Sequence, residues 1–160
     1  MNMFRRIPIA SLTIVGIAAC AMMSSSLRAQ QPDTAPALTG TWLQTINLQG
    51  EAPFQGLVTF NSDGTLTDTD QADVMPPDLA SPGHGVWVSS TTNTVRFKSV
   101  KFLFLASTPG APAGMSVSNG TLTMQDSNDF QSSGVVVFFS SEGQPVTAPF
   151  TSVGKRITVN

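Results

Sequence analysis

The chain has 160 residues, with eight basic and ten acidic side chains and a formal net charge of −2. This charge balance, without a basic cluster, excludes recognition of nucleic acid through its phosphate backbone. One histidine and one cysteine are too few ligands for an ordinary transition-metal site, so we expect no metal and no cofactor.

Residues 1–29 have the layout of a secretory signal peptide. Arg5 and Arg6 precede an apolar run from Ile7 to Met23, and a polar stretch follows it. The apolar run is slightly short for a membrane span and its end is rich in small residues. We therefore expect an exported protein, periplasmic or extracellular.

Two processing sites compete in this segment. Leu27-Arg28-Ala29 ends in a small residue, as signal peptidase requires, and cleavage there leaves a chain that begins near Gln30. Ile17-Ala18-Ala19-Cys20 resembles instead the lipobox of bacterial lipoproteins, which makes Cys20 the lipidation candidate and the protein membrane-anchored. The domain that follows contains no cysteine, so no disulfide stabilises it.

Residues 30–38 hold two prolines and no periodic pattern, which indicates a flexible tether. Removing the three basic residues of the signal segment from the eight in the chain leaves five, against ten acidic ones. Residues 39–160 have a suitable length for one domain with one core.

Residues 39–160 alternate short strand-like runs with turn residues. Val, Thr and Phe dominate the apolar and β-branched positions, and no helical period follows the signal segment. We expect about eight runs: 41–48, 55–61, 65–70, 84–90, 93–106, 114–118 with 121–126, 130–140 and 146–159. Dividing the sixth at its turn makes nine. The pattern predicts an all-β domain: a single antiparallel closed barrel of roughly eight strands, with no substantial helix.

Two turns can be tested against the faces of the strands that they join. Asn119-Gly120 suits a two-residue type I′ loop, which would pair Val117 with Leu122 on an apolar face. At Asn61-Ser62-Asp63-Gly64, a three-residue loop with Gly64 left-handed pairs Phe60 with Leu66 and keeps both on one face.

The longest run changes its apolar parity. Val95 and Phe97 lie at odd positions, whereas Val100 and Phe102 lie at even ones. A strand cannot change faces without an extra residue, so we expect a β-bulge near Ser99. Residues expected to point inward, and therefore to bind any ligand, are Val58, Phe60, Phe97, Val117, Leu122 and Met124.

Gly40-Thr41-Trp42 opens the first strand, and Gly154-Lys155-Arg156 lies on the last. In this respect the chain resembles the calycin group, the lipocalins and their relatives. The resemblance implies that Trp42 packs beneath Arg156 and closes one end of the barrel. The chain departs from the lipocalins in having no tyrosine, and so no T-D-Y motif, and no C-terminal helix is indicated.

Two further segments, 54–65 and 81–87, resemble recurrent parts of small exported bacterial proteins with a lipocalin-like or allene-oxide-cyclase-like barrel. Neither barrel implies a reaction by itself. The sequence contains no catalytic serine elbow, phosphate loop or zinc-protease pattern, and we assign no catalytic residue. His84, between two glycines, indicates a turn or a local hydrogen bond.

The region 63–78 contains five aspartates, whose spacing fits no calcium loop. We expect a solvated acidic loop there. The connection that follows, 75–82, has three prolines and is the kind of loop that can cover a barrel mouth.

Three functions fit such a barrel. The first is binding of a small apolar ligand in the barrel interior. The second is a filled barrel that serves as a structural or interaction protein of the cell envelope, and the third, implied only by the second resemblance, is a cyclase- or isomerase-like enzyme. Expected partners are a small hydrophobic ligand, the membrane only through the signal segment or a lipid anchor, and a second copy of the chain through the apolar runs 102–105 and 135–139.

Overall fold

The computed structural model describes residues 38–75, 78–108, 110–140 and 143–159. The expected signal peptide over 1–29, its Cys20, and the expected tether up to residue 37 lie outside these ranges. Leu38, the last residue assigned to the tether, is a buried residue of the core.

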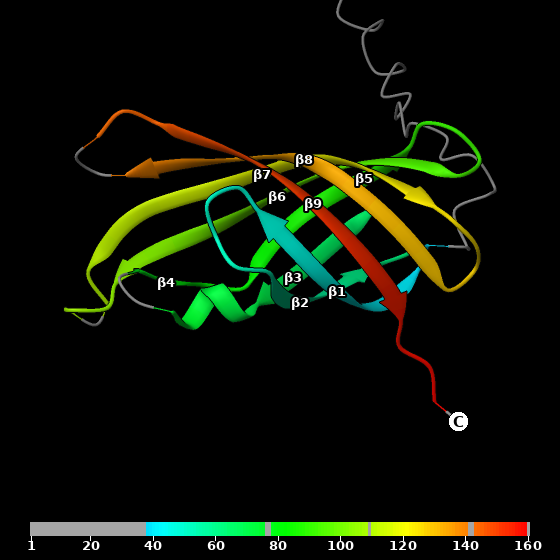
Figure 1. Ribbon diagram of the computed structural model, residues 1–160, viewed down its shortest axis with the longest axis horizontal. Helices are drawn as coiled ribbons and strands as arrows, with labels where there is room; N and C mark the ends of the chain where they lie inside the picture. Colours follow the sequence, from blue (N-terminus) through cyan, green and yellow to red (C-terminus); the bar gives the residue numbers. More distant parts are fainter. Residues whose placement is uncertain (1–37, 76–77, 109, 141–142, 160) are drawn as a thin grey trace, which may run out of the picture. The chain divides into compact units, whose positions relative to one another are not determined.

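Nine strands and one short 3-10 helix make up the described domain (Figure 1). The strands that form the barrel are long, alternate between buried and exposed positions, and follow one another along the chain with short connections. Their bounds are β1 Gly40–Leu48, β2 Phe54–Phe60, β3 Thr65–Asp70, β4 Asp78–Ala80, β5 Gly83–Ser89, β6 Thr94–Leu105, β7 Pro112–Met124, β8 Asp129–Ser140 and β9 Val146–Arg156, with the 3-10 helix η2 at Gln71–Val74.

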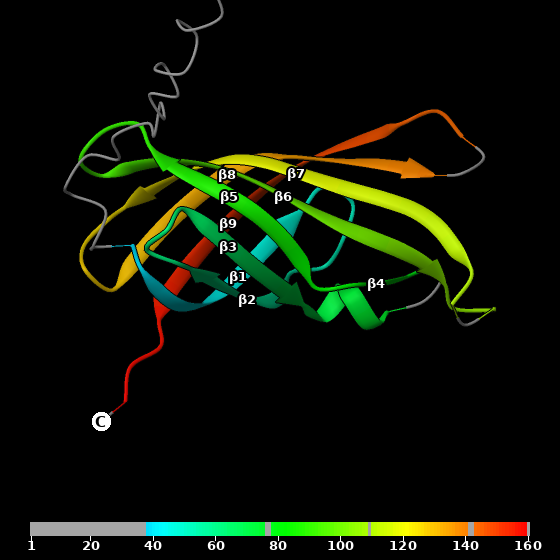
Figure 2. The ribbon, with the colours of Figure 1, turned by 180° about the vertical axis from the view of Figure 1, so that it is seen from behind.

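Eight of these strands close into an antiparallel barrel, which confirms the predicted fold. The order is β6-β5-β3-β2-β1-β9-β8-β7, and pairing of β6 with β7 closes the sheet (Figures 1 and 2). The short β4 pairs with β6 beyond the end of β5 and lies outside the eight. None of the helices in the described ranges is long and apolar enough to cross a membrane.

The turn between β2 and β3 is the three-residue loop that the sequence predicted. Phe60 pairs with Leu66, the Asn61 amide donates to the Thr65 carbonyl at 2.9 Å, and Gly64 has a φ of 85°. The Asp63 carboxylate accepts hydrogen bonds from the Thr65 hydroxyl and amide at 2.6 and 2.9 Å. Those hydrogen bonds hold the pKa of Asp63 below its ordinary value.

The predicted hairpin at Asn119-Gly120 is wrong. β7 runs straight through both residues, and Gly120 pairs with Phe97 on one side and Gly134 on the other. A Cβ at Gly120 would lie 2.6 Å from the Phe97 ring, so glycine is needed here because an aromatic ring covers the backbone, not because the chain turns.

The predicted bulge near Ser99 is also wrong. The β5–β6 and β6–β7 registers are regular through Ser99, and the irregularity in the β6–β7 pairing comes later, between Leu103 and Phe104. From Val95 to Lys101 the odd positions of β6 face inward: Ser99 and Lys101 are buried like Val95. The apolar parity changes because the interior becomes polar at this level, not because the strand turns over.

The core fills one end of the barrel. Its buried side chains come from most of the strands: Leu38, Trp42, Val58, Phe60, Leu66, Trp87, Val95, Leu122 and Phe130. Trp42 is fully buried, donates from Nε1 to the Leu38 carbonyl at 2.9 Å, and packs on the Phe130 ring with centroids 5.2 Å apart.

Arg156 lies over the Trp42 ring at this end of the barrel. Its guanidinium carbon lies 4.2 Å from the Trp42 ring centroid, and the two residues are partners in the β1–β9 ladder. Arg156 also donates from Nη1 to the Thr39 carbonyl at 2.7 Å and from Nε to the Ser127 carbonyl at 2.8 Å. This end of the barrel is therefore closed by packing, a cation–π contact and hydrogen bonds together.

Candidate functional site

The other end of the barrel contains a cavity of about 540 Å³. It begins above the core and reaches the β1–β2 loop, where Glu51 and Pro53 are exposed, and Met75, which follows η2. Cavities of this size accommodate small organic molecules. The interior is therefore filled at one end and open at the other.

The floor of the cavity is apolar. Val58, Phe60, Phe97 and Leu122, four of the six residues expected to point inward, line it. Whether they bind a ligand remains a prediction.

The other two expected residues lie elsewhere. Met124 packs against the core below the cavity and does not line it. The inward position expected of Val117 is wrong, because β7 continues straight and the cavity is lined by its neighbours Ser116 and Ser118. Successive side chains of a strand point to opposite faces, so Val117 lies on the outer face.

A belt of small polar side chains surrounds the middle of the cavity. Ser132 and Ser152 share a hydrogen bond of 2.8 Å between their hydroxyls, and Ser152 donates to the Gln44 amide oxygen at 3.2 Å. Ser99 and Ser116 are buried at the same part of the barrel wall. Serine fills less volume than the Val, Leu and Phe residues of the core, so this belt leaves the barrel hollow.

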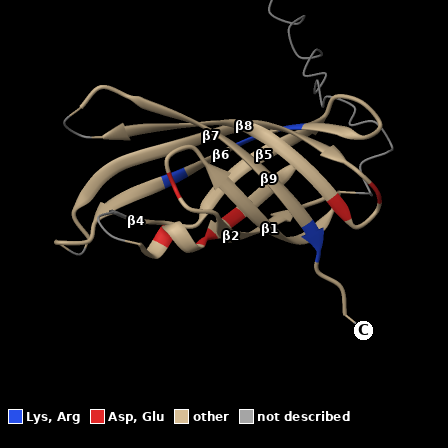
Figure 3. Cartoon of the chain, viewed as in Figure 1, with Lys and Arg blue, Asp and Glu red and all other residues tan. Residues whose placement is uncertain are grey.

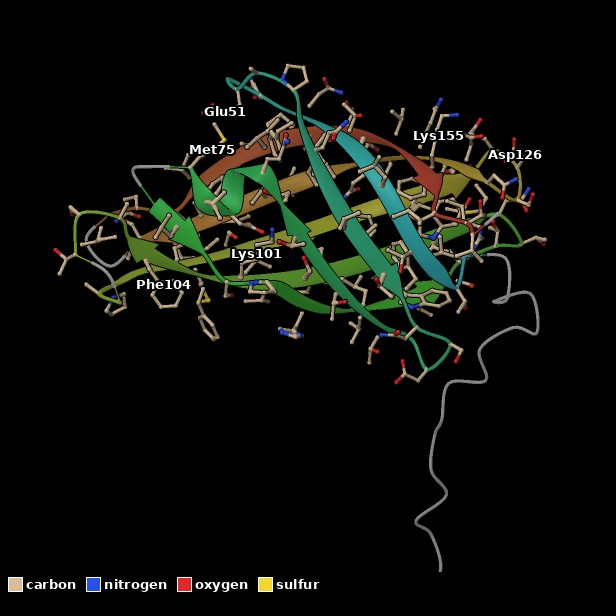
Figure 4. All side chains as sticks on the ribbon, turned by 90° about the horizontal axis from the view of Figure 1, so that it is seen from below. Glu51, Met75, Lys101, Phe104, Asp126 and Lys155 are labelled. Carbon is tan, nitrogen blue, oxygen red and sulfur yellow. The ribbon has the colours of Figure 1, made fainter. Side chains whose placement is uncertain are left out.

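One side of this belt carries a buried ionic cluster, which we define as Lys101 with Asp68, Asp70 and Asp73. The Lys101 ammonium lies 3.1 Å from Asp68 Oδ1, 2.7 Å from Asp70 Oδ2 and 2.7 Å from Asp73 Oδ1. All four side chains line the cavity and are at most 16% exposed. Figure 3 shows the acidic segments of β3 and η2 opposite a basic segment of β6, and Figure 4 labels Lys101 inside the barrel.

Local backbone structure positions the three carboxylates. Asp68 and Asp70 are two residues apart on β3, so both project inward. The 3-10 turn η2 returns Asp73 toward them: its Oδ2 accepts from the Asp70 amide at 2.8 Å and from the Thr69 hydroxyl at 3.0 Å. Gly83 on β5 leaves room for the Asp68 carboxylate, with which a Cβ would collide.

The pKa values of the cluster reflect both burial and mutual attraction. Burial raises the pKa of Asp70, which the Lys101 ammonium opposes and the carboxylates of Asp73 and Asp68 reinforce. Burial by itself would lower the pKa of Lys101, but the Asp68 and Asp70 carboxylates outweigh it and raise that pKa well above its ordinary value. Lys101 is therefore firmly charged, and Asp70 takes up a proton more readily than an ordinary aspartate.

One oxygen of the cluster has no partner. Asp70 Oδ1 is buried and accepts no hydrogen bond from any residue that the structure describes, although Asp70 Oδ2 is bound to Lys101. A buried acceptor without a donor is costly. The cluster contains three carboxyl groups and one ammonium group, so a hydrogen-bond donor or a cation that enters the cavity would be stabilised at Asp70.

The expectation of a solvated acidic loop is therefore wrong for Asp68, Asp70 and Asp73. Asp68 and Asp70 are two residues apart, as inward-facing residues of β3 must be. Lys101 is at an odd position of β6, like the inward-facing Val95 and Phe97. These two spacings in the sequence already indicated that the charged side chains point into the barrel. Asp63, by contrast, lies in the exposed turn before β3.

His84 lies outside this site. It is exposed on β5 and pairs through its backbone with Thr67 and Val100. Among the residues that the structure describes, no group of three or more His, Cys, Asp or Glu side chains is arranged to hold a metal ion.

Comparisons with known proteins identify the architecture. No protein-family model matches the chain, and no curated protein does. Among solved structures, a redesigned β-barrel is 21% identical over 78% of this chain and 96% of its own, with a TM-score of 0.50. A de novo designed fluorescence-activating β-barrel is 16% identical over 78% of this chain and 98% of its own, with a TM-score of 0.45. At 21% identity, the likeness to the redesigned β-barrel shows the barrel fold alone.

Proposed function

We propose that this barrel binds a small amphiphilic molecule in its cavity. The observation that carries the proposal is the composition of the cavity wall: an apolar floor that includes Phe60 and Leu122, and an ionic cluster held at its side by Lys101. An eight-stranded barrel can either fill its interior with side chains or hold one small ligand. Because the serine belt leaves this barrel hollow, we favour the binding of a ligand.

The ionic cluster suggests the orientation of the ligand. Its apolar part lies on the floor, and its polar part, a hydrogen-bond donor such as an amine, meets the unpartnered Asp70 Oδ1. This refines the purely apolar ligand expected from the sequence. It also disfavours the filled structural barrel, because a filled interior needs no cavity of about 540 Å³.

Titration with fluorescent probes tests this proposal. N-phenyl-1-naphthylamine is uncharged, aromatic and carries one N–H donor, and its emission rises in apolar surroundings. We expect saturable binding at a single site, and weaker binding of the anionic probe 1-anilinonaphthalene-8-sulfonate because its sulfonate would be repelled by the carboxylates.

A matched pair of variants locates the site. Ser116→Leu adds bulk to the cavity wall from a buried position, whereas Ser133→Leu adds the same bulk at an exposed position of β8. We expect Ser116→Leu to weaken binding of the naphthylamine probe at least about tenfold and Ser133→Leu to leave it unchanged. No saturable binding, or equal binding by both variants, would contradict the proposal.

We also propose that the protein acts outside the cytoplasm, in the periplasm, at the cell surface or in the extracellular space. This rests on the signal-like pattern of residues 1–29. N-terminal sequencing of the protein recovered from its native host distinguishes cleavage after Ala29 from acylation at Cys20.

We further propose that the chain is a member of the calycin group. The stacking of Arg156 on Trp42 supports this proposal.

A further inference from the structure

The outer surface of β6, β7 and β8 carries an apolar face beside the cavity mouth. Phe102 pairs with Met115, and Met115 with Phe139, so these three form one row across the strands. Val100, Val117 and Val137 form the next row. We call these six residues the outer apolar face; Phe102 is 62% exposed and Met115 40% exposed.

The face continues toward the mouth. Phe104 follows on β6 and points away from the barrel (Figure 4), while its neighbour Leu103 lines the cavity. On β8, Phe138 lines the cavity and Phe139 belongs to the outer face. The same strand segments therefore present apolar side chains to the cavity and to the outside.

The exposed charges that β6 places beside this face are positive. Arg96 and Lys98 are exposed on the outer side of β6, next to Val88 and Val86 of β5, which are 47% and 60% exposed. Within β5, β6 and β7 there is no acidic residue, and the one acidic residue of β8, Asp129, lies at the far end of that strand.

We propose that the outer apolar face docks on the surface of an anionic lipid bilayer. Exposed apolar area supplies attraction to the acyl region, and Arg96 and Lys98 supply attraction to anionic headgroups. A second copy of the chain fits less well, since pairing two such faces brings four like charges to one interface. When the barrel docks in this way, its cavity mouth lies beside the membrane, and an amphiphilic ligand can enter the cavity from there. The docking itself does not depend on the proposed ligand.

Sedimentation with vesicles tests the docking. The chain from Gln30, which contains all nine strands and the whole core, is compared with the full chain on vesicles of phosphatidylcholine alone and of phosphatidylcholine mixed with phosphatidylglycerol. We expect binding to the mixed vesicles that falls as salt is raised, and weak binding to phosphatidylcholine alone.

Two matched pairs of variants define the surface. Phe102→Ser on the outer apolar face is compared with Leu57→Ser, which removes an apolar side chain 41% exposed on β2. Lys98→Gln is compared with Lys155→Gln, whose side chain is 82% exposed on β9. We expect Lys98→Gln to weaken vesicle binding about fivefold and Phe102→Ser to weaken it at least as much, with both controls unchanged.

Any result other than these contradicts the proposed docking on the membrane. Absence of binding to mixed vesicles by the chain from Gln30 excludes it, and so does equal loss in the control variants. A solution dimer that Phe102→Ser dissociates, without vesicle binding, assigns the face to a second copy instead. Because the probe titration above needs no membrane, failure of the docking and failure of the proposed ligand binding are separate results.

Discussion

Replacing Lys101 by methionine tests whether the ionic cluster is assembled around its ammonium group. The side chain is 11% exposed and makes ion pairs with three carboxylates. Lys101→Met keeps most of the apolar stem but leaves those carboxylates close together without a cation. Removing one partner of a buried ion pair costs about 3–5 kcal/mol, and we expect the lower end, about 3 kcal/mol, because water can enter from the open cavity.

The loss should depend on pH with a definite sign. Burial and neighbouring carboxylates already raise the pKa of Asp70, and the Lys101 ammonium opposes them. Without that ammonium, the pKa of Asp70 in the folded variant lies still further above its unfolded value. A carboxyl with a raised folded pKa binds its proton more tightly in the folded state, so the free energy of unfolding rises as pH falls toward about 4. The difference between wild type and Lys101→Met should therefore narrow in acid.

Urea unfolding followed by tryptophan fluorescence measures both effects, since Trp42 and Trp87 are buried. Lys155→Met is the control: that lysine pairs with Asp129 at 3.1 Å but is 82% exposed, and its loss should change stability by less than about 0.5 kcal/mol. A Lys101→Met variant that loses less than about 1 kcal/mol at neutral pH, or whose loss is constant from neutral pH to about 4, would refute the assembly of the cluster around Lys101.

Three further predictions concern the same fold. Trp42→Ala should lower the free energy of unfolding by about 3–5 kcal/mol, as truncation of a buried aromatic residue does, measured in urea with Trp87 as the reporter; a loss under about 1 kcal/mol would contradict the closure of the barrel by Trp42. Gly120→Val should cost about 1–3 kcal/mol by overpacking against Phe97, and thermal unfolding that matches wild type would show that the ring can move aside. Asp70→Asn should have a free energy of unfolding within about 1 kcal/mol of wild type at neutral pH, because the change removes a buried charge along with an ion pair. In acid it should lack the rise in stability that protonation of Asp70 gives to wild type, which urea unfolding curves at several pH values measure.

The strand pattern of this chain was predictable because most strands keep one polar and one apolar face. The Ser62-Asp63-Gly64 turn followed from requiring Phe60 and Leu66 to share a face, and the structure has that pairing. The same logic failed at Asn119-Gly120. That dipeptide is typical of a tight turn, but Gly120 is needed because the Phe97 ring covers its backbone. This is a contact between strands, which a local sequence pattern does not contain.

The candidate site was harder to predict, because its residues contradict the rule that charges lie outside. Asp68, Asp70 and Lys101 occupy inward positions of their strands, and only their mutual pairing across the barrel makes burial tolerable. The pairing joins β3 to β6, 31 residues apart for Asp70 and Lys101. The spacing of Asp68 and Asp70 was visible in the sequence, but the cation opposite them depends on the closure of the sheet.

The change of parity in β6 links the cavity to the outer apolar face. From Thr94 to Lys98, apolar side chains face inward and charged ones outward; from Ser99 onward, Ser99 and Lys101 face inward while Val100 and Phe102 face outward. β7 has the same inversion, with Ser116 inside and its neighbour Met115 outside. A soluble barrel needs no such inversion for its stability, since exposed apolar rows gain nothing in water. The inversion is explained if this end of the barrel binds the polar part of a ligand inside the cavity and contacts the apolar region of a bilayer on the outside.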